Sequence, residues 1–483
     1  MSTPQPSDAL VFFGATGDLA YKQIFPALQA LIRRGELNVP IVGVAWSDWS
    51  LDQLRARARD SLEHHGGVDP TAFDKLCGLL RYVDGDYADQ GTFERLRHEL
   101  GAAQRPLHYL AIPPSAFSEV IGGLARAGCA ANARVAVEKP FGRDLASAEA
   151  LNRTIHEFFP ERSVFRIDHY LGKEPVLNLL YFRFANLSLE AMLDREHVDS
   201  VQITMAERFG VAGRGKFYEE TGAIRDVIQN HMLQLVSILA MDPPVGDDVE
   251  ALRDEKARIL KAIAPLDAEH VVRGQYRGYR DEPGVARDSR VETFAAVELR
   301  IESWRWAGVP FFIRAGKCLP VNAVELRVQL RRPPREIFGE SAPSSQYFRF
   351  RVGPDVSALA LGMRVKRPGD AMVGREVELL ASEDIARDML PYERLLGDAM
   401  RGDASLFARE DAIEAQWRIV DPVLDLDSAP YPYEPGSWGP TEADRLVARI
   451  PGGWRKPVVP NGAGASSESS VLLHQGAHAL VGE

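Results

Sequence analysis

The stretch ALVFFGATGDLA, residues 9–20, decides the fold of the first part of this chain. Its first five residues are an unbroken apolar run, and a helix-like pattern of apolar residues follows over residues 19–34. A second apolar run, PIVGVA at residues 40–45, completes a strand, a helix and a second strand. This order predicts a βαβ unit, which is the building block of a parallel sheet.

A glycine-rich turn joins the first predicted strand to its helix. Gly14 and Gly17 are its glycines, and Ala20 takes the place of a third. Small residues there let the backbone approach a pyrophosphate, whose negative charge is favoured by the amide groups at the start of the helix. A tight turn without a ligand can have the same composition. The strands and the helix around the turn favour a Rossmann-like dinucleotide site.

The rest of the chain shows two patterns of predicted strands. Strands separated by helical stretches are predicted at residues 80–83, 106–112 and 134–137, which extends a parallel sheet covered on both faces. After about residue 180 the strands follow one another without a helix between each pair, and we predict them at residues 198–205, 293–301, 310–314 and 323–330. This second pattern predicts a larger α+β domain with a mostly antiparallel sheet.

The length supports two domains. A chain of 483 residues is about twice the length over which one hydrophobic core usually grows. We expect a dinucleotide-binding domain at residues 1–170 and a substrate-binding and dimerisation domain at residues 171–455. The remainder, residues 456–483, contains the biased run GAGASSESS and is expected to be a mobile tail.

The composition argues against several classes of partner. A net charge of −11 disfavours nucleic acid and anionic membranes, because both require a basic surface. No run approaches the roughly 20 apolar residues that cross a bilayer, and residues 1–6 are polar, so we expect a cytoplasmic protein. The three cysteines are far apart and show no CxxC spacing, which predicts neither a disulfide framework nor a metal cluster.

The stretch RIDHYLGKE, residues 166–174, is the most informative one for a ligand. Pro175 fits the first turn of a helix, so Lys173 would lie at a helix N-terminus, where amide groups and the helix dipole favour an anion. His169, Tyr170 and Lys173 could together bind a phosphate there. The alternative is a capped helix start with ordinary surface polar groups.

A candidate base lies on a later helix. Residues 221–236 carry an apolar stripe at helical spacing with Thr221 as the expected N-cap, and His231 falls on that stripe. A histidine at such a position is more often an ordinary core residue. A role as a base needs a partner carboxylate, and Asp168 is the available one.

Two further segments end predicted strands at the same carboxyl edge as the glycine turn. AIPP at residues 111–114 places Pro113 there, and VEKPFG at residues 137–142 places Lys139 there. Ligands of such sheets bind at this edge. A lysine after a strand is also common on ordinary surfaces, so Lys139 alone does not decide between the two roles.

Together these segments resemble the glucose-6-phosphate dehydrogenase family. GATGDLA, EKPFG, RIDHYLGKE, GAIRDVIQNH, WRWAGVPFFIRAGK and PYEPGSWGP look like that family's successive signatures, in its order. RIDHYLGKE is highly specific to the family, whereas the glycine turn and the EKP triplet are not. The resemblance implies oxidation of glucose 6-phosphate at C1 to 6-phosphogluconolactone, the first step of the pentose phosphate pathway, with hydride transfer to NADP or NAD and without a metal.

The resemblance also implies roles for individual residues. His231 would be the general base that takes the proton of the C1 hydroxyl, and Asp168 would hold its ring. The substrate-binding residues would be Lys139, His169, Tyr170, Lys173, Glu207, Asp226 and Lys317. The coenzyme-binding residues would be Gly14, Thr16, Gly17, Asp18, Leu19, Trp46, Asp86, Tyr87, Pro113 and Lys139. We expect a homodimer or a homotetramer.

Three positions depart from the family pattern. Asn322 stands where a second basic substrate residue is usual, and Gln23 stands where a lysine is expected near the active site. Trp46 replaces an arginine at the end of the second strand, and Asp48 follows two residues later. An arginine there can pair with the 2′-phosphate of NADP, so we predict weak discrimination between the coenzymes, with a possible preference for NAD.

Two other functions are compatible with these residues. One is a two-domain dehydrogenase for another aldose or aldose phosphate, against which RIDHYLGKE argues. The other is a catalytically silent sugar-phosphate sensor, which Gln23 and Asn322 favour. The presence of both Asp168 and His231 argues against a silent sensor, because a binding module does not need that pair.

Overall fold

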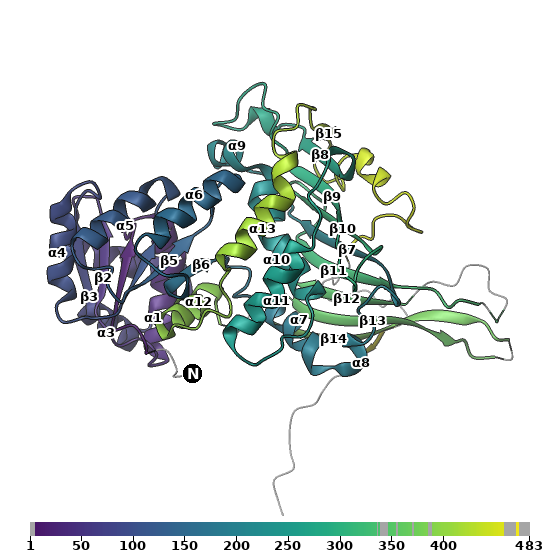
Figure 1. Cartoon of the computed structure of the whole chain (residues 1–483), viewed down its shortest axis with the longest axis horizontal. Helices are drawn as coiled ribbons and strands as arrows, with labels where there is room; N and C mark the ends of the chain where they lie inside the picture. Colours follow the sequence, from purple (N-terminus) through teal and green to yellow (C-terminus); the bar gives the residue numbers. More distant parts are fainter. Residues whose placement is uncertain are drawn as a thin grey trace, which may run out of the picture. The chain divides into compact units, whose positions relative to one another are not determined.

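The computed structural model describes residues 5–335, 337–338, 346–353, 356–369, 371–384, 389–457 and 470–472. The chain divides into two units (Figure 1). Unit 1 comprises Met1–Lys173, Met241–Lys261 and Asp388–Asp421, and unit 2 comprises Glu174–Ala240, Ala262–Arg387 and Pro422–Glu483. Most of the expected tail at residues 456–483 lies outside the described residues. A domain boundary at residue 170 stays a prediction.

Unit 1 is built on a parallel sheet with the strand order β3-β2-β1-β4-β5-β6, which confirms the predicted Rossmann-like architecture. The strands are β1 (Ala9–Phe13), β2 (Ile41–Ala45), β3 (Leu80–Asp84), β4 (Pro106–Leu110), β5 (Arg134–Glu138) and β6 (Val164–Ile167). The sequence analysis did not predict β6, which leads directly into Asp168. The chain order reverses between β1 and β4, and open parallel sheets bind ligands at the carboxyl side of such a point.

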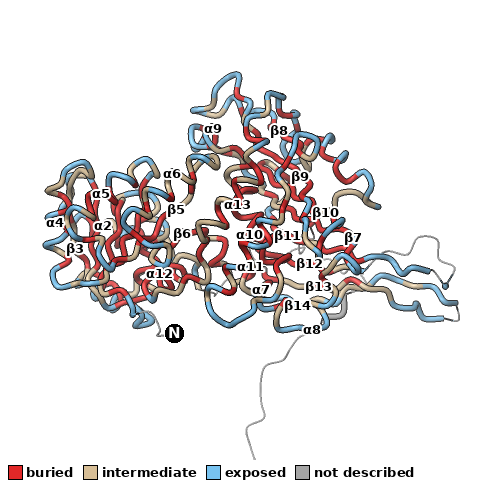
Figure 2. Tube along the Cα trace, in the orientation of Figure 1, coloured by how far each residue is buried: buried red, intermediate tan, exposed pale blue. Residues whose placement is uncertain are grey.

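The first strand is apolar throughout because helices cover both of its faces. Phe12 makes an edge-on contact with Phe25 of α1 at a ring separation of 5.9 Å, whereas the next residue, Phe13, lies 6.4 Å from Phe93 of α4. β1 is therefore buried along its whole length. The strands β5 and β6 of the same sheet are also largely buried (Figure 2). The helices between the strands are η1 (Ala20–Ile24), α1 (Phe25–Arg33), α2 (Leu51–His64), α3 (Pro70–Leu79), α4 (Gln90–Leu100), η2 (Pro114–Ala116), α5 (Phe117–Arg126), α6 (Leu145–His156) and η3 (Glu161–Ser163).

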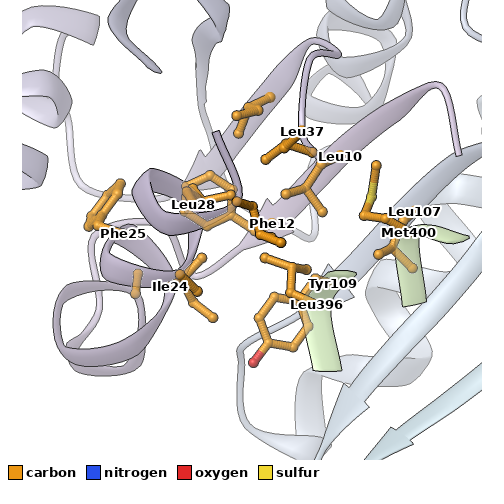
Figure 3. Packing of buried hydrophobic residues seen from close by; sticks show 14 of the residues in the cluster. Leu10, Phe12, Ile24, Phe25, Leu28, Leu37, Leu107, Tyr109, Leu396 and Met400 are labelled. Carbon is orange, nitrogen blue, oxygen red and sulfur yellow. The ribbon is translucent and has the colours of Figure 1, made fainter. Parts of the chain in front are cut away.

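Two later segments of the chain complete unit 1. They form α11 (Val249–Lys261), α12 (Pro391–Arg401) and α13 (Glu410–Val420). Leu396 and Met400 of α12 belong to the same core cluster as Leu107 and Tyr109 of β4 (Figure 3). The indole N–H of Trp417 in α13 donates to the carbonyl of Phe141 at 2.8 Å. Helical periodicity marks the buried faces of these segments but does not identify the sheet that they cover.

Unit 2 contains a larger sheet with the strand order β15-β8-β9-β10-β7-β11-β12-β13-β14-β16. It is mostly antiparallel, as predicted, but three pairings are parallel: β7 with β10, β8 with β15 and β14 with β16. Its strands are β7 (Val198–Ala206), β8 (Val271–Tyr276), β9 (Phe294–Arg300), β10 (Pro310–Gly316), β11 (Ala323–Leu330), β12 (Tyr347–Val352), β13 (Val356–Lys366), β14 (Gly374–Asp384), β15 (Tyr431–Tyr433) and β16 (Ser470–Leu472). The four strands predicted for this part of the chain correspond to β7, β9, β10 and β11.

Helices of unit 2 lie mainly between β7 and β8 and before β7. They are α7 (Glu174–Ala185), α8 (Leu187–Glu190), α9 (Gly215–Ala223), η4 (Ile224–Met232) and α10 (Leu233–Ala240), with the short turns η5 (Ala268–His270), η6 (Tyr279–Asp281) and η8 (Thr441–Arg445). A further short turn, η7 (Asp421–Val423), lies where the chain passes from unit 1 to unit 2. Among the helices that the structure describes, none combines the length and the apolar composition needed to span a membrane.

The backbone at Gly14, directly after β1, passes close to that of Ala111, directly after β4. The φ angle of Gly14 is +75°, and a Cβ atom at this residue would lie 2.3 Å from the carbonyl oxygen of Ala111. Its amide N–H is shared between the carbonyl of Val44, at 2.9 Å, and the hydroxyl of Tyr87, at 3.0 Å. Three loops at the carboxyl edge of the sheet therefore meet at a residue that has no room for a side chain.

We predict that Gly14→Ala lowers Tm by at least twice as much as Gly35→Ala. Gly35 has a similar φ of +78° but open space around its added Cβ, so the control measures backbone strain alone. That strain is worth about 1–2 kcal/mol, or roughly 2–8 °C in a domain of this size. Calorimetry of the two variants compares them. Equal decreases in Tm would show that the approach to Ala111 is not a real constraint.

Candidate active site

The turn after β1 starts a helix at the carboxyl edge of the unit 1 sheet. The Gly17 amide donates to the Gly14 carbonyl at 2.9 Å, and the Tyr21 amide donates to the Gly17 carbonyl at 3.1 Å. Ala20 is fully buried, so a small residue is required at this third position. Leu19, beside it, is half-buried. The turn can thus direct helix-start amide groups toward an anion at the point where the strand order reverses.

The side chains of the turn already have partners. The Thr16 hydroxyl lies 2.7 Å from the hydroxyl of Ser47, which follows β2. Asp18 pairs with Lys22 at 2.9 Å, and the hydrogen bond from Lys22 is the main reason that the pKa of Asp18 is lowered. This pairing neutralises the carboxylate that would otherwise repel a pyrophosphate near the turn.

The loop after β2 is held by a carboxylate at the end of β3. Asp84 Oδ1 accepts hydrogen bonds from the amides of Ser47, at 3.0 Å, and Asp48, at 2.9 Å. Burial acts to raise the pKa of Asp84, but these amides and the Tyr82 hydroxyl outweigh it and leave the pKa lowered. The Trp46 side chain is 71% exposed. The loop therefore presents an indole ring and the carboxylate of Asp48 at the position where an arginine is usual in the family that the sequence resembles.

The other predicted coenzyme residues lie on loops at the same edge. The Tyr87 hydroxyl accepts the Gly14 amide, so this tyrosine does touch the glycine turn. Asp86 instead uses its carboxylate locally, since Oδ1 accepts the Ala88 amide at 3.0 Å. Pro113 directly precedes η2 after β4, and Lys139 directly follows β5. Coenzyme contacts for these residues stay predictions.

A buried carboxyl group lies next to Lys139 and was assigned no role by the sequence analysis. Glu138, the last residue of β5, accepts hydrogen bonds from the hydroxyl of Tyr109 and, at 3.4 Å, from that of Tyr392. Burial raises its pKa to about 7, although both hydroxyls and the Lys139 charge oppose that shift. The available signal was a glutamate at the end of an apolar strand. Glu138 ties α12 to the carboxyl edge of the sheet.

The predicted phosphate-binding stretch forms a tight turn after β6. The Tyr170 amide donates to Asp168 Oδ1 at 3.0 Å, and the Lys173 amide donates to the Tyr170 carbonyl at 3.1 Å. The Lys173 ammonium lies 3.8 Å from the centre of the Tyr170 ring. The His169 ring is stacked on Tyr392 at 6.4 Å. The turn therefore gathers the cation, the imidazole and the phenol that the sequence analysis expected to act together.

The N-terminal half of α12 packs against this stretch at Gly172. A Cβ atom at Gly172 would lie 2.9 Å from the Pro391 carbonyl oxygen and 3.0 Å from Leu395 Cγ. Glycine is therefore needed for the turn to lie against α12. Because α12 comes about 220 residues later in the chain, sequence spacing offered no signal for this contact.

Unit 2 brings together two of the predicted substrate residues. β7 and β10 pair in parallel with Ala206 opposite Gly316, so the next residues, Glu207 and Lys317, lie side by side at the ends of the two strands. Their side chains form an ion pair of 2.5 Å, and both are largely buried. A buried ion pair of this kind can bind sugar hydroxyls from both of its partners.

A tyrosine that the sequence analysis missed lies among the predicted substrate residues of unit 2. Tyr218 of α9 is buried, and the Lys317 ammonium lies 5.7 Å from its ring centre. Burial raises the pKa of Tyr218 well above its usual value, and the charges of Asp226, Glu292 and Glu207 add to that effect. Tyr218 thus links the ion pair at the strand ends to the helix that carries Asp226.

The helix that carries Asp226 and His231 is a π-helix, η4. Its first amide, that of Ile224, donates to Glu292 Oε1 at 3.0 Å. The predicted N-cap role of Thr221 is wrong, because Thr221 lies inside α9 and its hydroxyl donates to the Phe217 carbonyl. A long-range carboxylate therefore replaced the local cap.

His231 lies on the buried face of this helix, as the apolar stripe predicted. It is 3% exposed, and its neighbours on the stripe are buried as well. The wider π turn is held in part by Asn230, whose side-chain amide donates to the Arg225 carbonyl at 2.9 Å. Single π turns inside helices are often found at functional sites.

The structure shows the environment of two residues, Asn322 and Gln23, that depart from the family pattern. The Asn322 side-chain oxygen accepts the Arg208 amide at 2.7 Å, so this residue closes the loop that follows Glu207. Gln23 lies half-buried in η1, the helix that follows the glycine turn. Neither side chain replaces the positive charge that is usual at its position.

Comparison with known proteins identifies relatives for nearly the whole chain. A family model described as the NAD binding domain of glucose-6-phosphate dehydrogenase matches residues 11–178, and one described as the C-terminal domain of glucose-6-phosphate dehydrogenase matches residues 180–455. Glucose-6-phosphate 1-dehydrogenase 1 of Mycobacterium tuberculosis is 45% identical over 464 residues, covering 95% of this chain and 98% of that protein. The cytoplasmic isoform of glucose-6-phosphate 1-dehydrogenase from Solanum tuberosum is 40% identical, and the alignment covers 91% of this chain and 91% of that protein.

Solved structures show the same similarity. The crystal structure of glucose-6-phosphate 1-dehydrogenase from Mycobacterium avium superposes with a TM-score of 0.89 at 46% identity, covering 94% of this chain and 100% of that one. A glucose-6-phosphate dehydrogenase in complex with its substrate, glucose-6-phosphate, superposes with a TM-score of 0.86 at 35% identity over the same shares of the two chains.

Proposed function

The chain belongs to the glucose-6-phosphate dehydrogenase family, and we propose that the side chains described above carry out that family's reaction here. The reaction is the oxidation of glucose 6-phosphate at C1 to 6-phosphogluconolactone with hydride transfer to NAD(P). The observation that carries the assignment is the turn from Asp168 to Lys173, which holds the expected cation, imidazole and phenol together. Coenzyme reduction measured by absorbance, with glucose 6-phosphate, with glucose and without sugar, tests it.

We assign the proton transfer to His231. NAD(P)⁺ accepts the hydride that leaves C1, and that departure requires removal of the C1 hydroxyl proton. An imidazole, whose ordinary pKa is near neutrality, suits this task. Asp168 would orient the ring and stabilise the imidazolium, and the Tyr170 amide fixes its carboxylate. Asp168 belongs to unit 1 and His231 to unit 2, so the proposal requires that the two side chains meet in the working enzyme.

The remaining substrate contacts follow from charge. His169, Tyr170 and Lys173 would bind the 6-phosphate, because they form the cationic turn. The hexose hydroxyls would be bound by Glu207, Asp226 and Lys317, and Lys139 would touch both sugar and coenzyme. Support for the hydroxyl site is the buried Glu207–Lys317 ion pair, which offers both donors and acceptors.

We propose that the coenzyme site discriminates weakly between NADP and NAD, with a preference for NAD. The amides of Ser47 and Asp48 already donate to Asp84, so neither of these two amides is available to a 2′-phosphate, and the loop contains no guanidinium. Two cations that could supply the charge from elsewhere in unit 1, Lys22 and Arg55, are also engaged. Lys22 pairs with Asp18, and the Arg55 guanidinium donates to the Cys77 carbonyl at 2.8 Å. One lost charge-assisted contact is worth roughly 1.5–3 kcal/mol, which is about ten- to a hundredfold in affinity.

We also propose that the enzyme works in the cytoplasm as a homodimer or homotetramer. The Solanum tuberosum relative is described as a cytoplasmic isoform. In unit 2, Met372 and Val373, between β13 and β14, are 52% and 44% exposed, and Leu379 of β14 is 38% exposed. A second copy of the chain could cover these apolar side chains.

We expect His231→Asn to lower kcat by about 10²- to 10⁴-fold while KM stays within a few-fold, because only proton transfer is lost. Asp168→Asn should slow the same step, and the double variant should be little slower than the slower single one. Initial rates with saturating coenzyme measure both effects. A near-normal kcat for His231→Asn would remove this residue from the role of base.

For Lys173→Ala we expect a higher KM for glucose 6-phosphate and a much smaller change in kcat/KM for free glucose. The substitution removes a cation from the turn that would bind the phosphate. Comparing kcat/KM for the two sugars isolates the phosphate contact. Equal losses with both sugars would show that Lys173 does not bind the phosphate.

Trp46→Arg should raise kcat/KM for NADP by roughly tenfold or more and leave that for NAD within a few-fold, since it restores a guanidinium at the end of β2. The matched control is Trp49→Arg, which adds the same charge three residues later in the loop. Steady-state rates with both coenzymes at saturating glucose 6-phosphate make the comparison. A wild-type preference for NADP would contradict the proposed preference for NAD, and one of a hundredfold or more would also contradict weak discrimination.

A further inference from the structure

We propose that Tyr433 of β15 is a positioning residue for Lys317, and that its hydroxyl fixes the backbone from which the Lys317 side chain reaches the sugar. The inference rests on the role proposed above for Lys317 in binding glucose 6-phosphate. It gives a function to the segment PYEPGSWGP, residues 432–440, in which the sequence analysis identified no site residue. The residues that support it all lie in unit 2.

Lys317 directly follows β10, where the chain makes a sharp bend. The next residue, Cys318, has a φ angle of +51°, in the left-handed region that residues other than glycine rarely adopt. Such a conformation persists only where the surrounding structure holds it. The direction in which the Lys317 side chain leaves the backbone therefore depends on the contacts that hold this bend.

Both backbone groups of Lys317 make hydrogen bonds within the core. The Lys317 amide donates to the carbonyl of Thr293 at 2.9 Å, and the Lys317 carbonyl accepts a hydrogen bond from the Tyr433 hydroxyl at 2.7 Å. Tyr433 is 3% exposed, and Thr293 is fully buried. Because a buried carbonyl is costly to leave without its donor, the Tyr433 hydroxyl holds Lys317 in one place.

A chain of three hydrogen bonds sets the direction of the Tyr433 hydroxyl. The Tyr276 amide donates to Thr293 Oγ1 at 2.9 Å, and Thr293 Oγ1 lies 3.1 Å from the Tyr433 hydroxyl oxygen. The nearest acceptor of Tyr433 is the Lys317 carbonyl, so the Thr293 hydroxyl is the donor in its contact with Tyr433. Each hydroxyl thus both donates and accepts, which favours a single arrangement of these groups.

A second contact from the segment 432–440 holds the other side of the bend. The Gly436 amide donates to the Cys318 carbonyl at 2.7 Å, while the Cys318 amide donates to the Phe209 carbonyl at 3.0 Å. The segment therefore binds two successive carbonyl groups, one on each side of the left-handed residue. This arrangement provides the contacts that the bend after Lys317 requires.

The charged end of Lys317 depends on the same bend. Its ammonium forms the ion pair of 2.5 Å with Glu207 and lies 5.1 Å from the centre of the Phe209 ring. The Glu207 amide donates to the Gly316 carbonyl at 3.1 Å, and the Glu207 carbonyl accepts the Leu319 amide at 2.9 Å. A shift of the bend would therefore displace the ammonium and the carboxylate together, and small displacements of this kind weaken substrate binding and catalysis.

Close packing fixes the segment 432–440 to the sheet. β15 pairs with β8 at one edge of the unit 2 sheet (Figure 1). A Cβ atom at Gly439 would lie 2.5 Å from Phe294 Cε2, and one at Gly274 would lie 2.9 Å from Pro440 Cδ. The Tyr433 ring contacts Phe294 edge-on at 5.8 Å. The ring alone can serve this packing, so a substitution that removes only the hydroxyl separates positioning from packing.

The test compares Tyr433→Phe with the control Tyr279→Phe in the full-length enzyme. Both tyrosines belong to one buried cluster and donate a hydrogen bond of 2.7 Å, Tyr433 to the Lys317 carbonyl and Tyr279 to Glu219 Oε1. For Tyr433→Phe we expect Kd and KM for glucose 6-phosphate to rise about five- to tenfold, with kcat and the coenzyme KM within about threefold. Tyr279→Phe should leave all four values within about twofold. Calorimetric titration gives Kd without turnover.

A double variant shows whether Tyr433 acts through Lys317. In the Lys317→Met background, Tyr433→Phe should change Kd for glucose 6-phosphate by less than about twofold, because the side chain that it positions is gone. Tm should fall in both backgrounds, since the buried hydrogen bond is lost from the backbone carbonyl in each. If Tyr433→Phe does not fold, Thr293→Val takes its place. That substitution removes the hydroxyl that orients Tyr433 and should raise Kd about threefold.

Three results would overturn the proposal. They are a wild-type Kd for glucose 6-phosphate in the folded Tyr433→Phe or Thr293→Val enzyme, an equal rise in Tyr279→Phe, and an undiminished rise in the Lys317→Met background. The proposed function fails separately, if the wild type binds glucose 6-phosphate but does not reduce coenzyme with it. The comparison of Kd values still decides the role of Tyr433 in that case.

Discussion

The close approach of Gly14 to the Ala111 carbonyl is the constraint on which the coenzyme half of this protein depends. With a Cβ atom at residue 14 only 2.3 Å from that oxygen, β1 and β4 could not end side by side. The same glycine's amide holds Tyr87 and the end of β2, so the loops that would contact a dinucleotide take their positions from it. A residue without a side chain thus lets the carboxyl edge present backbone amide groups to a charged ligand.

Buried ionisable groups recur wherever a functional side chain is placed. Glu138 ties α12 to the end of β5, Glu292 holds the start of the helix that carries His231, and the buried Arg253 of α11 pairs with Glu161. Each such group opposes folding unless a partner satisfies it, so each requires a specific neighbour from a distant part of the chain. Because each of these groups depends on its neighbour, a substitution at one of them is expected to disturb the other.

The departures from the family pattern fall where charge, not shape, is expected to matter. Asn322 keeps a local role by accepting the Arg208 amide, and the loop with Trp46 keeps its form because Asp84 binds its amides. These contacts explain how the fold tolerates the changes. They also explain why the consequences would appear in affinity for anionic ligands instead of in stability.

The sequence by itself determined the parallel sheet, the glycine turn, the helix start at Pro175 and the buried stripe that contains His231, because these depend on patterns within about 20 residues. It also carried the family resemblance. Only the tertiary structure decided that Glu207 and Lys317 form a pair, that Glu292 and not Thr221 caps the helix of His231, and that α11 and α12 pack into the first unit. Strand register and helix packing bring together residues that are tens to hundreds of positions apart in the sequence. The hydrophobic pattern shows that one face of a helix or strand is buried, but it does not identify the element that packs against that face.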